Sequence, residues 1–287
     1  MNKKIIDKKI FRCPECGNKD LLFEEGKIKC SKCGASYRVD DNKYFFVEKL
    51  DCPEDFIDKL KYRFKRFSGF YTFLIKVISP VFTYNQLGRF VKAYVRRKNG
   101  SFLNLGSGNR VLSPEMINVD ILPYKNVDII ADIQNLPVAD GEMDIAVCSA
   151  VLEHVKDPYR VVNEIYRVLK KGGLTYCYMP FICGFHASPD DYTRLTYEGM
   201  KVLFKDFDIV ELGVGGGPTS GLLWVLQEWL ATLLSFGSRR LHFIFYVFFM
   251  LITFPIKYLD IILSKFPTAK NIASGFYIIA RKKGDET

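Results

Sequence analysis

A series of short apolar segments between residues 102 and 180 decides the fold, and it opens Phe102-Leu103-Asn104-Leu105-Gly106-Ser107-Gly108. This first segment is an apolar strand that runs directly into a glycine turn. Further apolar runs, each ending on a polar residue, occupy residues 117–120, 128–132 and 144–149. A helical pattern over residues 161–169 then precedes a strand over residues 174–179. Alternation of this kind predicts an α/β fold, with a parallel sheet wound by helices.

The turn after the first strand is the expected ligand site, because ligands of such sheets bind outside the carboxyl ends of the strands. Gly106 and Gly108 lie there, and without side chains they let backbone amides approach a ligand. A dinucleotide fingerprint needs a third glycine for close helix packing, and Val111 occupies that position. Asp120, at the end of the second strand, can accept hydrogen bonds from both hydroxyls of a ribose. The combination predicts a nucleoside ligand without a pyrophosphate.

The same segments resemble the class I S-adenosylmethionine (SAM)-dependent methyltransferases of the methyltransferase type 11 group. Motifs of that group are matched, in order, by residues 103–108, 117–120, 131–132, 136–137, 143–144, 151–155, 157–158, 164 and 167–173. A set of motifs in fixed order is far more specific than a glycine turn alone. The resemblance implies a Rossmann-like seven-stranded methyltransferase sheet within a domain of residues 100–287.

The resemblance also implies SAM as the cofactor. Asp120 would bind its ribose, Asp132 and Ile133 would lie at its adenine, and Ser149 would line the pocket floor. The full set of implied cofactor-binding residues is Asn104, Gly106, Ser107, Gly108, Asp120, Asp132, Ile133 and Ser149.

Two positions in the first motif depart from the family pattern. Asn104 replaces the more usual Asp, and Arg110 stands where many relatives have Gly. An asparagine still accepts a hydrogen bond, so we expect weakened or altered cofactor binding rather than none. A chain without cofactor binding would be a non-catalytic methyltransferase-like binding module, which is one alternative.

The composition limits the partners and the compartment. With 48% hydrophobic and 25% charged residues, the 287-residue chain can bury a full core plus one small module. The net charge of +9 predicts an anionic partner, either nucleic acid or a membrane surface with anionic lipids. Eight cysteines without a disulfide-like spacing suit a reducing cytosol. Residues 1–11 lack the apolar stretch of a signal peptide, so we expect a cytoplasmic protein.

Four cysteines form two Cys-x-x-Cys pairs, Cys13/Cys16 and Cys30/Cys33. Each pair puts two thiolates on one side of a tight turn, and two pairs complete a tetrahedral site that suits structural Zn²⁺. Residues 1–50 resemble the zinc ribbons found ahead of some rRNA methyltransferases and the small Trm112-like proteins. The ribbon is either a structural staple or a grip on substrate or RNA. We expect its core to be separate from that of the methyltransferase sheet.

Residues 51–99 read as a basic, amphipathic helical segment. An apolar stripe at helical spacing is formed by Phe56, Leu60, Phe64, Phe67 and Tyr71. A cationic flank is formed by Lys59, Arg63 and Arg66. This pattern predicts a helix in the interface of an anionic membrane. The alternative is a helical bundle over the mouth of the active site. A second basic helix is predicted over residues 87–98.

Two of the three histidines follow strands that end at the ligand edge. His154 follows the fourth strand, where we expect a structural role, and His186 follows the fifth. The loop of residues 186–196 resembles one in methyltransferases encoded among bacterial surface-polysaccharide genes. We expect His186 to be the general base, Asp190 or Asp191 to orient its ring, and Arg194 to bind an anionic part of the acceptor. The alternative is that these side chains only pin the loop to the next helix.

Residues 218–267 form an apolar helical insert between the last two strands. Residues 221–236 and 241–254 are almost wholly apolar, and a soluble surface does not leave so much apolar area uncovered. The second run spans only about 21 Å, against a hydrocarbon core of about 30 Å. Extending it would carry Lys257 and Asp260 into the membrane. A peripheral or monotopic hairpin is therefore expected, with a homodimer interface as the alternative.

We expect a SAM-dependent methyltransferase at the cytosolic face of the membrane. It would methylate an oxygen, or alternatively a nitrogen, of an amphiphilic acceptor such as a lipid-linked glycan or polysaccharide precursor. Methyl transfer mainly requires the positioning of nucleophile and methyl group, with removal of a proton from a hydroxyl acceptor. The principal alternative is an rRNA base methyltransferase that uses the ribbon as its grip.

Overall fold

The computed structural model describes residues 6–47, 78–79, 81–82, 85–96, 99–186 and 190–284. The amphipathic helix predicted over residues 56–71 lies outside the described residues, so its membrane contact remains a prediction. Of the second basic helix, the structure contains α3 (Gln86–Phe90) and the π-helical segment η3 (Val91–Val95).

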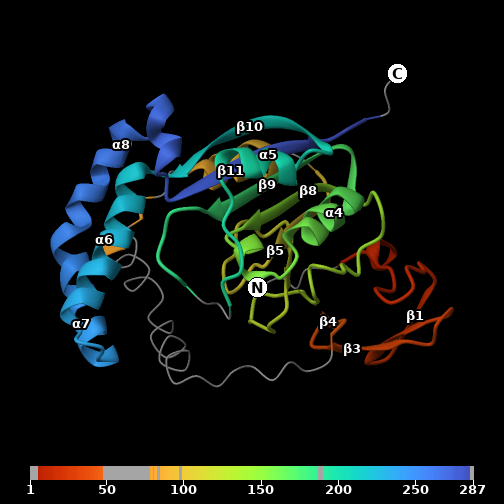
Figure 1. Ribbon diagram of the computed structural model, residues 1–287. Helices are drawn as coiled ribbons and strands as arrows, with labels where there is room; N and C mark the ends of the chain where they lie inside the picture. The colour runs from red at the N-terminus through yellow and green to blue at the C-terminus, as the bar shows by residue number, and fades with distance from the viewer. Residues whose placement is uncertain are drawn as a thin grey trace.

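Seven strands form the sheet that the sequence predicts, and they lie at the centre of the molecule (Figure 1). They are β5 (Phe102–Leu105), β6 (Met116–Asp120), β7 (Ile129–Ile130), β8 (Met143–Ser149), β9 (Leu169–Pro180), β10 (Phe207–Gly216) and β11 (Gly275–Lys282). Their order is β7-β6-β5-β8-β9-β11-β10, and among these seven β11 alone runs opposite to the rest. The strand order reverses at β5, which makes its carboxyl end the switch point where ligands bind. The predicted Rossmann-like α/β sheet is confirmed.

The sheet is larger than predicted, because the N-terminal ribbon extends it. The ribbon's strands are β1 (Leu21–Glu24), β2 (Lys27–Cys30), β3 (Ser36–Asp40) and β4 (Lys43–Phe45). Tyr44 of β4 pairs in parallel with Ile129 of β7, and its amide donates to the Asp128 carbonyl over 3.0 Å. Across the described residues the sheet therefore has eleven strands, the seven predicted for the methyltransferase sheet and four from the ribbon, which was not predicted to join it. Without the ribbon, β7 would be an edge strand with unpaired backbone groups, and β4 pairs with these groups.

The ribbon and the methyltransferase sheet share one hydrophobic core. Phe11, Ile28 and Tyr37 of the ribbon belong to the same buried cluster as Leu136 and Val138, which follow β7. Main-chain hydrogen bonds reinforce the contact, from the residue 12 amide to the residue 137 carbonyl (3.1 Å) and from residue 139 to residue 10 (2.7 Å). The expectation of a separate ribbon core is wrong, because the loop after β7 presents an apolar surface that the ribbon covers.

Helices cover both faces of the seven central strands. On one face, α4 (Pro158–Val168) and α5 (Tyr197–Leu203) pack on the larger core, and the Thr196 hydroxyl caps α5 by accepting from the Gly199 amide. On the other face, α3 and η3 pack on a smaller cluster that includes Phe102 and Met116. Neighbouring residues of β5, β8 and β11 alternate between the two clusters, as the pleat requires.

The apolar insert leaves the sheet between β10 and β11, as predicted. It consists of α6 (Pro218–Leu234), α7 (Arg239–Thr253), η5 (Phe254–Leu259), α8 (Asp260–Leu263) and η6 (Pro267–Asn271). Gly216 at the end of β10 pairs with Gly275 at the start of β11, so the insert extends from what would be a hairpin turn. Figure 1 shows α6–α8 beside that end of the sheet, well away from the ribbon. Among the described residues, one helix, Arg239–Leu263, is long and apolar enough to cross a membrane.

Two charged residues within the insert, Lys257 and Asp260, are buried in the protein. Lys257 is 1% exposed and donates to the Ser79 carbonyl over 2.6 Å. Asp260 is fully buried and accepts from the amides of Thr219 and Ser220 at the start of α6, over 2.7 and 2.9 Å. Asp260 therefore ties the end of the insert to the start of α6, and Lys257 ties it to the segment before α3.

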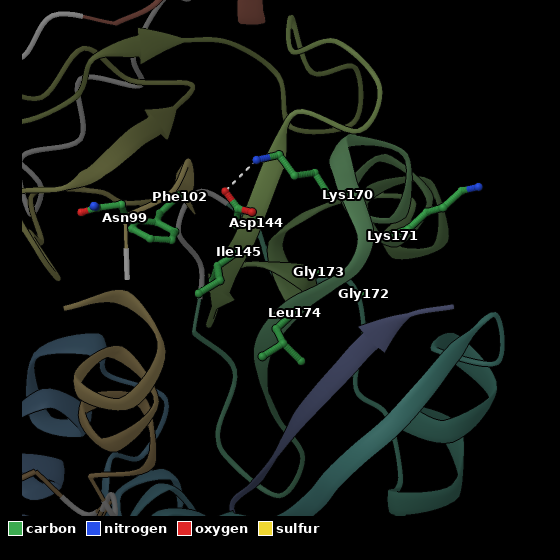
Figure 2. Close-up of a pocket in the computed structure, with 9 residues that line it drawn as sticks. All are labelled: Asn99, Phe102, Asp144, Ile145, Lys170, Lys171, Gly172, Gly173 and Leu174. Carbon is green, nitrogen blue, oxygen red and sulfur yellow. Dashed lines mark hydrogen bonds and ion pairs between the residues drawn. The ribbon is translucent and has the colours of Figure 1, made fainter. Parts of the chain in front are cut away.

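A pocket at the amino ends of the strands, drawn in Figure 2, is not the expected ligand site. It is lined at the amino ends of β5 and β8, where Lys170 donates to Asp144 over 2.9 Å and Asp144 accepts from the Ser101 amide. Ligands of this fold bind at the carboxyl ends of the strands.

Candidate functional site

The glycine turn after β5 has the backbone geometry that its sequence requires. Gly106 has φ +62°, and a Cβ there would lie 2.4 Å from Val151 Cγ2, in the turn after β8. Gly108 has φ +52°, and no heavy atom lies within 4 Å of where its Cβ would be. Gly106 thus packs against the neighbouring turn, whereas Gly108 has open space where a side chain would lie.

Asp120 lies directly beside this turn. Its side chain is 8% exposed and accepts from the Gly108 amide over 2.7 Å and from the Leu122 amide over 2.9 Å. Burial raises the pKa of the Asp120 carboxyl, and backbone donors, those of Leu122 and Gly108 among them, oppose that shift. A carboxylate offers about four acceptor positions, so two remain for the hydroxyls of a ribose.

The structure gives Asn104 a role that an aspartate could not fill. Its Nδ2 donates to Asn118 Oδ1 over 2.9 Å and to the Arg110 carbonyl over 3.3 Å. Asn104 therefore ties the end of the glycine turn to β6, and a carboxylate at this position could donate neither bond. This contact explains the departure at position 104.

The remaining predicted cofactor residues end the neighbouring strands. Asp132 follows β7 and accepts from the Gln134 amide over 2.8 Å, while Ile133 beside it is 6% exposed. Ser149 is the last residue of β8, and Ala150 after it has φ +57°, a conformation uncommon for a residue with a side chain. The structure therefore brings all the predicted cofactor residues to the carboxyl ends of β5, β6, β7 and β8.

A second group of polar side chains lies after β8 and β9. Glu153 and His154 are in the 3₁₀ turn η4 (Leu152–His154), and the loop after β9 carries His186. Glu153 Oε1 lies 3.7 Å from His154 Nε2, and the rings of His154 and His186 are 5.0 Å apart. Burial raises the pKa of Glu153 to about 7. Glu153 was not assigned a role from the sequence, and its burial is a tertiary property that no local pattern signals.

The loop after β9 differs in detail from the prediction. Asp191, rather than Asp190, lies beside His186: its carboxylate accepts from the His186 amide over 3.0 Å and is 3.8 Å from Nδ1. The Asp190 carboxylate accepts from the Tyr192 hydroxyl over 2.7 Å instead. Arg194 donates to both carboxylate oxygens of Asp191. The guanidinium predicted to bind an anionic part of the acceptor is therefore paired with a carboxylate of the protein.

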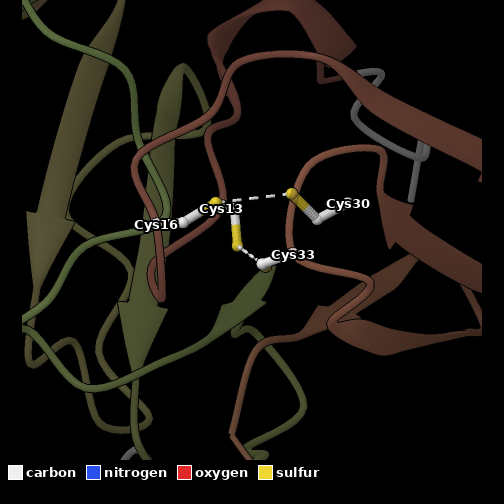
Figure 3. Close-up of side chains that lie close together, drawn as sticks. All are labelled: Cys13, Cys16, Cys30 and Cys33. Carbon is white, nitrogen blue, oxygen red and sulfur yellow. Dashed lines mark hydrogen bonds between the residues drawn. The ribbon is translucent and has the colours of Figure 1, made fainter.

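The four cysteines of the ribbon converge, as Figure 3 shows. The Sγ atoms of Cys13 and Cys33 are 3.6 Å apart and those of Cys16 and Cys30 are 3.5 Å apart, and all four lie within 4.8 Å of one another. Four sulfurs at about 2.3 Å from a tetrahedral zinc ion lie about 3.8 Å apart, so the set fits this ion. The Tyr37 hydroxyl lies 3.1 Å from Cys13 Sγ and can donate to a thiolate there.

Comparison with known proteins finds methyltransferases. Residues 111–177 match the family model described as a methyltransferase domain. An uncharacterised methyltransferase of Mycobacterium sp. (strain KMS) is 52% identical over 40 residues, which are 14% of this chain and 16% of that protein. A thiol S-methyltransferase of Rattus norvegicus is 49% identical over 39 residues, again 14% of this chain and 16% of its own length. The chain therefore matches about a sixth of the length of these curated relatives.

One solved structure aligns with most of this chain at low sequence identity. The 1,6-didemethyltoxoflavin-N1-methyltransferase of Burkholderia thailandensis, solved with bound S-adenosylhomocysteine, shows 12% identity and a TM-score of 0.45. That alignment covers 89% of this chain and 98% of the other. The strand order and the match over residues 111–177 support the resemblance to class I methyltransferases that the motifs predict.

Proposed function

We propose that this protein is a SAM-dependent methyltransferase that acts at the cytosolic face of a membrane on an amphiphilic acceptor. The observation that carries the proposal is a contact between the apolar insert and the loop after β9: the Trp224 ring of α6 lies 5.8 Å from the His186 ring. The insert thus adjoins the side of the site where an acceptor would enter.

The cofactor half of the proposal rests on the glycine turn and Asp120. The proposed contacts to a nucleoside are the open space beside Gly108, the buried Asp120 carboxylate with acceptor capacity left, and Asp132 after the next strand. The absence of a pyrophosphate-binding third glycine favours SAM over a dinucleotide.

Asp120→Ala is expected to weaken SAM binding by about 1.5–3 kcal/mol, or roughly 10- to 100-fold, through two lost charge-assisted hydrogen bonds. Isothermal titration calorimetry with SAM measures the effect. Asp208→Ala, which removes an exposed carboxylate on β10, is the charge-matched control and should bind SAM as the wild type does. A wild-type protein that binds no SAM would leave only the non-catalytic binding module.

The membrane half of the proposal rests on the exposed face of the insert. No residue of α7 is buried, and Phe243 is 67% exposed. Large apolar side chains exposed on α6–α8 include Leu222, Val225, Trp229, Leu233, Phe236, Ile244, Phe248, Leu251, Ile252, Leu259 and Ile262. So many large apolar side chains exposed on neighbouring helices support a membrane or protein contact. The net charge of +9 favours anionic lipid as the contact.

The acceptor is proposed to be an oxygen nucleophile on a lipid-linked glycan or polysaccharide precursor. The apolar part of such a molecule would contact the insert, and its polar part would contact the loop after β9 that carries His186. Close packing couples these two elements, since a Cβ at Gly184 would lie 2.7 Å from Trp224 Nε1 and 2.9 Å from Glu228 Cγ. Strand β4 of the ribbon pairs with β7 and extends the sheet. This pairing favours a structural role for the ribbon over a role in binding RNA.

Replacing residues 221–266 with a short Gly/Ser linker is expected to move the protein from the membrane fraction to the soluble fraction. The sheet should survive, because Gly216 and Gly275 already face one another at a hairpin position. Fractionation and a melting curve measure the two effects, and a Phe243→Ser/Phe248→Ser variant should show a partial shift without the deletion. A wild-type protein that is soluble and monomeric would contradict the membrane proposal, and a soluble dimer would favour the homodimer interface.

The acceptor class is tested by measuring cofactor consumption against membrane lipid extract, soluble nucleotide-sugars and ribosomal RNA in parallel. Turnover is expected only with the lipid extract. Turnover with ribosomal RNA would instead favour the rRNA methyltransferase.

A further inference from the structure

We propose that Glu153, His154 and His186 form a second metal site, which binds a divalent transition-metal ion with an open coordination position toward the acceptor. One metal-binding atom from each of the three side chains lies within 4.8 Å of the others. Two imidazoles and one carboxylate are a ligand set that zinc uses in catalytic sites, where the fourth position holds water or substrate.

The buried carboxylate of Glu153 is the first argument for an ion. Glu153 has no solvent exposure, and neither carboxylate oxygen accepts a hydrogen bond from any residue that the structure describes. A buried carboxylate without partners is costly, and such groups in proteins are normally paired or bound to a metal. A cation at this position would satisfy both oxygens.

The orientation of His154 is the second argument. Its Nδ1 lies within hydrogen-bond distance of the Asp190 carbonyl oxygen, which can only accept, so Nδ1 carries the proton. In the neutral ring Nε2 then has a lone pair, and this atom faces Glu153 Oε1 at 3.7 Å. Two acceptors that face each other need a proton or a cation between them. Ligands at about 2.0–2.1 Å from a tetrahedral zinc ion lie about 3.4 Å apart, close to the observed separation.

The surroundings match those of a histidine metal site. Metal-bound histidines usually donate their second ring nitrogen to a backbone carbonyl or carboxylate. The Asp190 carbonyl fills this position for His154, and Nδ1 of His186 lies 3.8 Å from the Asp191 carboxylate and 3.5 Å from Nη2 of Arg194. The Tyr192 amide donates to the Glu153 carbonyl over 2.7 Å and holds the loop against the turn η4. The charge of Arg194, which would oppose a cation, is matched by its bidentate pairing with Asp191.

The site adjoins the proposed methyl donor, so a role in methyl transfer follows if the proposed function is correct. Val151, two residues before Glu153, packs against Gly106 of the cofactor turn. A metal-bound acceptor hydroxyl has a lowered pKa and releases its proton to solvent. The oxygen's electron pair then forms a bond to the methyl carbon, the carbon–sulfur bond of SAM breaks, and that electron pair remains on sulfur. His186 would serve this step as a ligand to the ion rather than as a free base.

The test is a titration of the purified full-length protein, with zinc in its ribbon, with Co²⁺ and separately with Zn²⁺. We expect one equivalent to bind beyond the ribbon's ion, with the weak visible absorption of cobalt bound by nitrogen and oxygen. Glu153→Gln and His154→Ala should each lower the affinity at least tenfold. His242→Ala removes the remaining histidine, on α7, and should leave the titration unchanged. A wild type that binds no ion beyond the four-cysteine equivalent overturns the proposal, whatever the variants do.

An activity measurement separates this proposal from the proposed function. Turnover that falls at least tenfold when a mild chelator removes the second ion, and returns with Zn²⁺, supports both. An ion that binds without any methyl transfer upholds the metal site and contradicts the proposed function. Methyl transfer that is unaffected by removal of the second ion contradicts the metal's role and leaves His186 as a general base.

Discussion

His186→Ala is expected to lower methyl-transfer turnover by about 10²–10⁴-fold, which is the range for loss of a group that assists proton removal. The affinity for SAM should stay within a factor of a few, because the predicted cofactor residues end β5, β6, β7 and β8, whereas His186 follows β9. The expectation holds whether His186 acts as a base or as a metal ligand, since both make the acceptor a better nucleophile.

Three measurements on the same variant interpret the result: single-turnover kinetics, a SAM titration and a melting curve. His242→Ala is the matched control, because this imidazole lies on α7 and pairs with Glu228 over 3.3 Å. If His186 only pins the loop, its loss should lower the melting temperature and the SAM affinity together with the rate. Arg194→Ala should share the loop effect, because Arg194 holds Asp191 beside His186.

The Cys30→Ser/Cys33→Ser variant is expected to lose its zinc and to unfold at a temperature lower by on the order of 10 °C. Loss of a structural metal is among the changes that cost more than about 4 kcal/mol, and about 1 kcal/mol corresponds to 2–4 °C in a chain of this size class. The effect should reach the methyltransferase sheet, because Phe11 and Ile28 share its core and β4 pairs with β7.

The same variant should also bind SAM more weakly. Asn135, near the proposed adenine contacts, donates to the Pro14 carbonyl over 2.9 Å, so the ribbon supports that loop. Elemental analysis, a melting curve and a SAM titration measure the three effects, with Cys52→Ser as a control outside the two pairs. A variant that loses its zinc and keeps the wild-type melting temperature would show that the cores are independent after all.

The cofactor side of the site was predictable because its signals are local. A strand that ends in Gly106-Ser107-Gly108 and a second strand that ends in Asp120 meet at the same sheet edge in any parallel α/β fold. The Cys-x-x-Cys pairs are similarly informative, since each spacing places two sulfurs on one turn.

The acceptor side was less predictable because side-chain pairing within a loop depends on its folded path. The sequence offered Asp190 and Asp191 equally as partners of His186, and the structure places Asp191 there while Asp190 contacts Tyr192 and, through its carbonyl, His154. The sequence around Glu153 does not indicate that its carboxylate is fully buried, and this burial is what makes it a candidate metal ligand.

The sequence by itself determined the order of the central strands' motifs, the glycine turn with Asp120, the pairing of the cysteines and the position of the apolar insert. Each of these depends on residue type at short spacing, where backbone sterics and strand periodicity leave few alternatives. Only the tertiary structure decided that β4 joins the edge of β7, that Lys257 and Asp260 turn inward, and that Glu153 lies unpaired against His154. These features depend on contacts between residues far apart in the chain, whose partners are selected by the packing of the whole core.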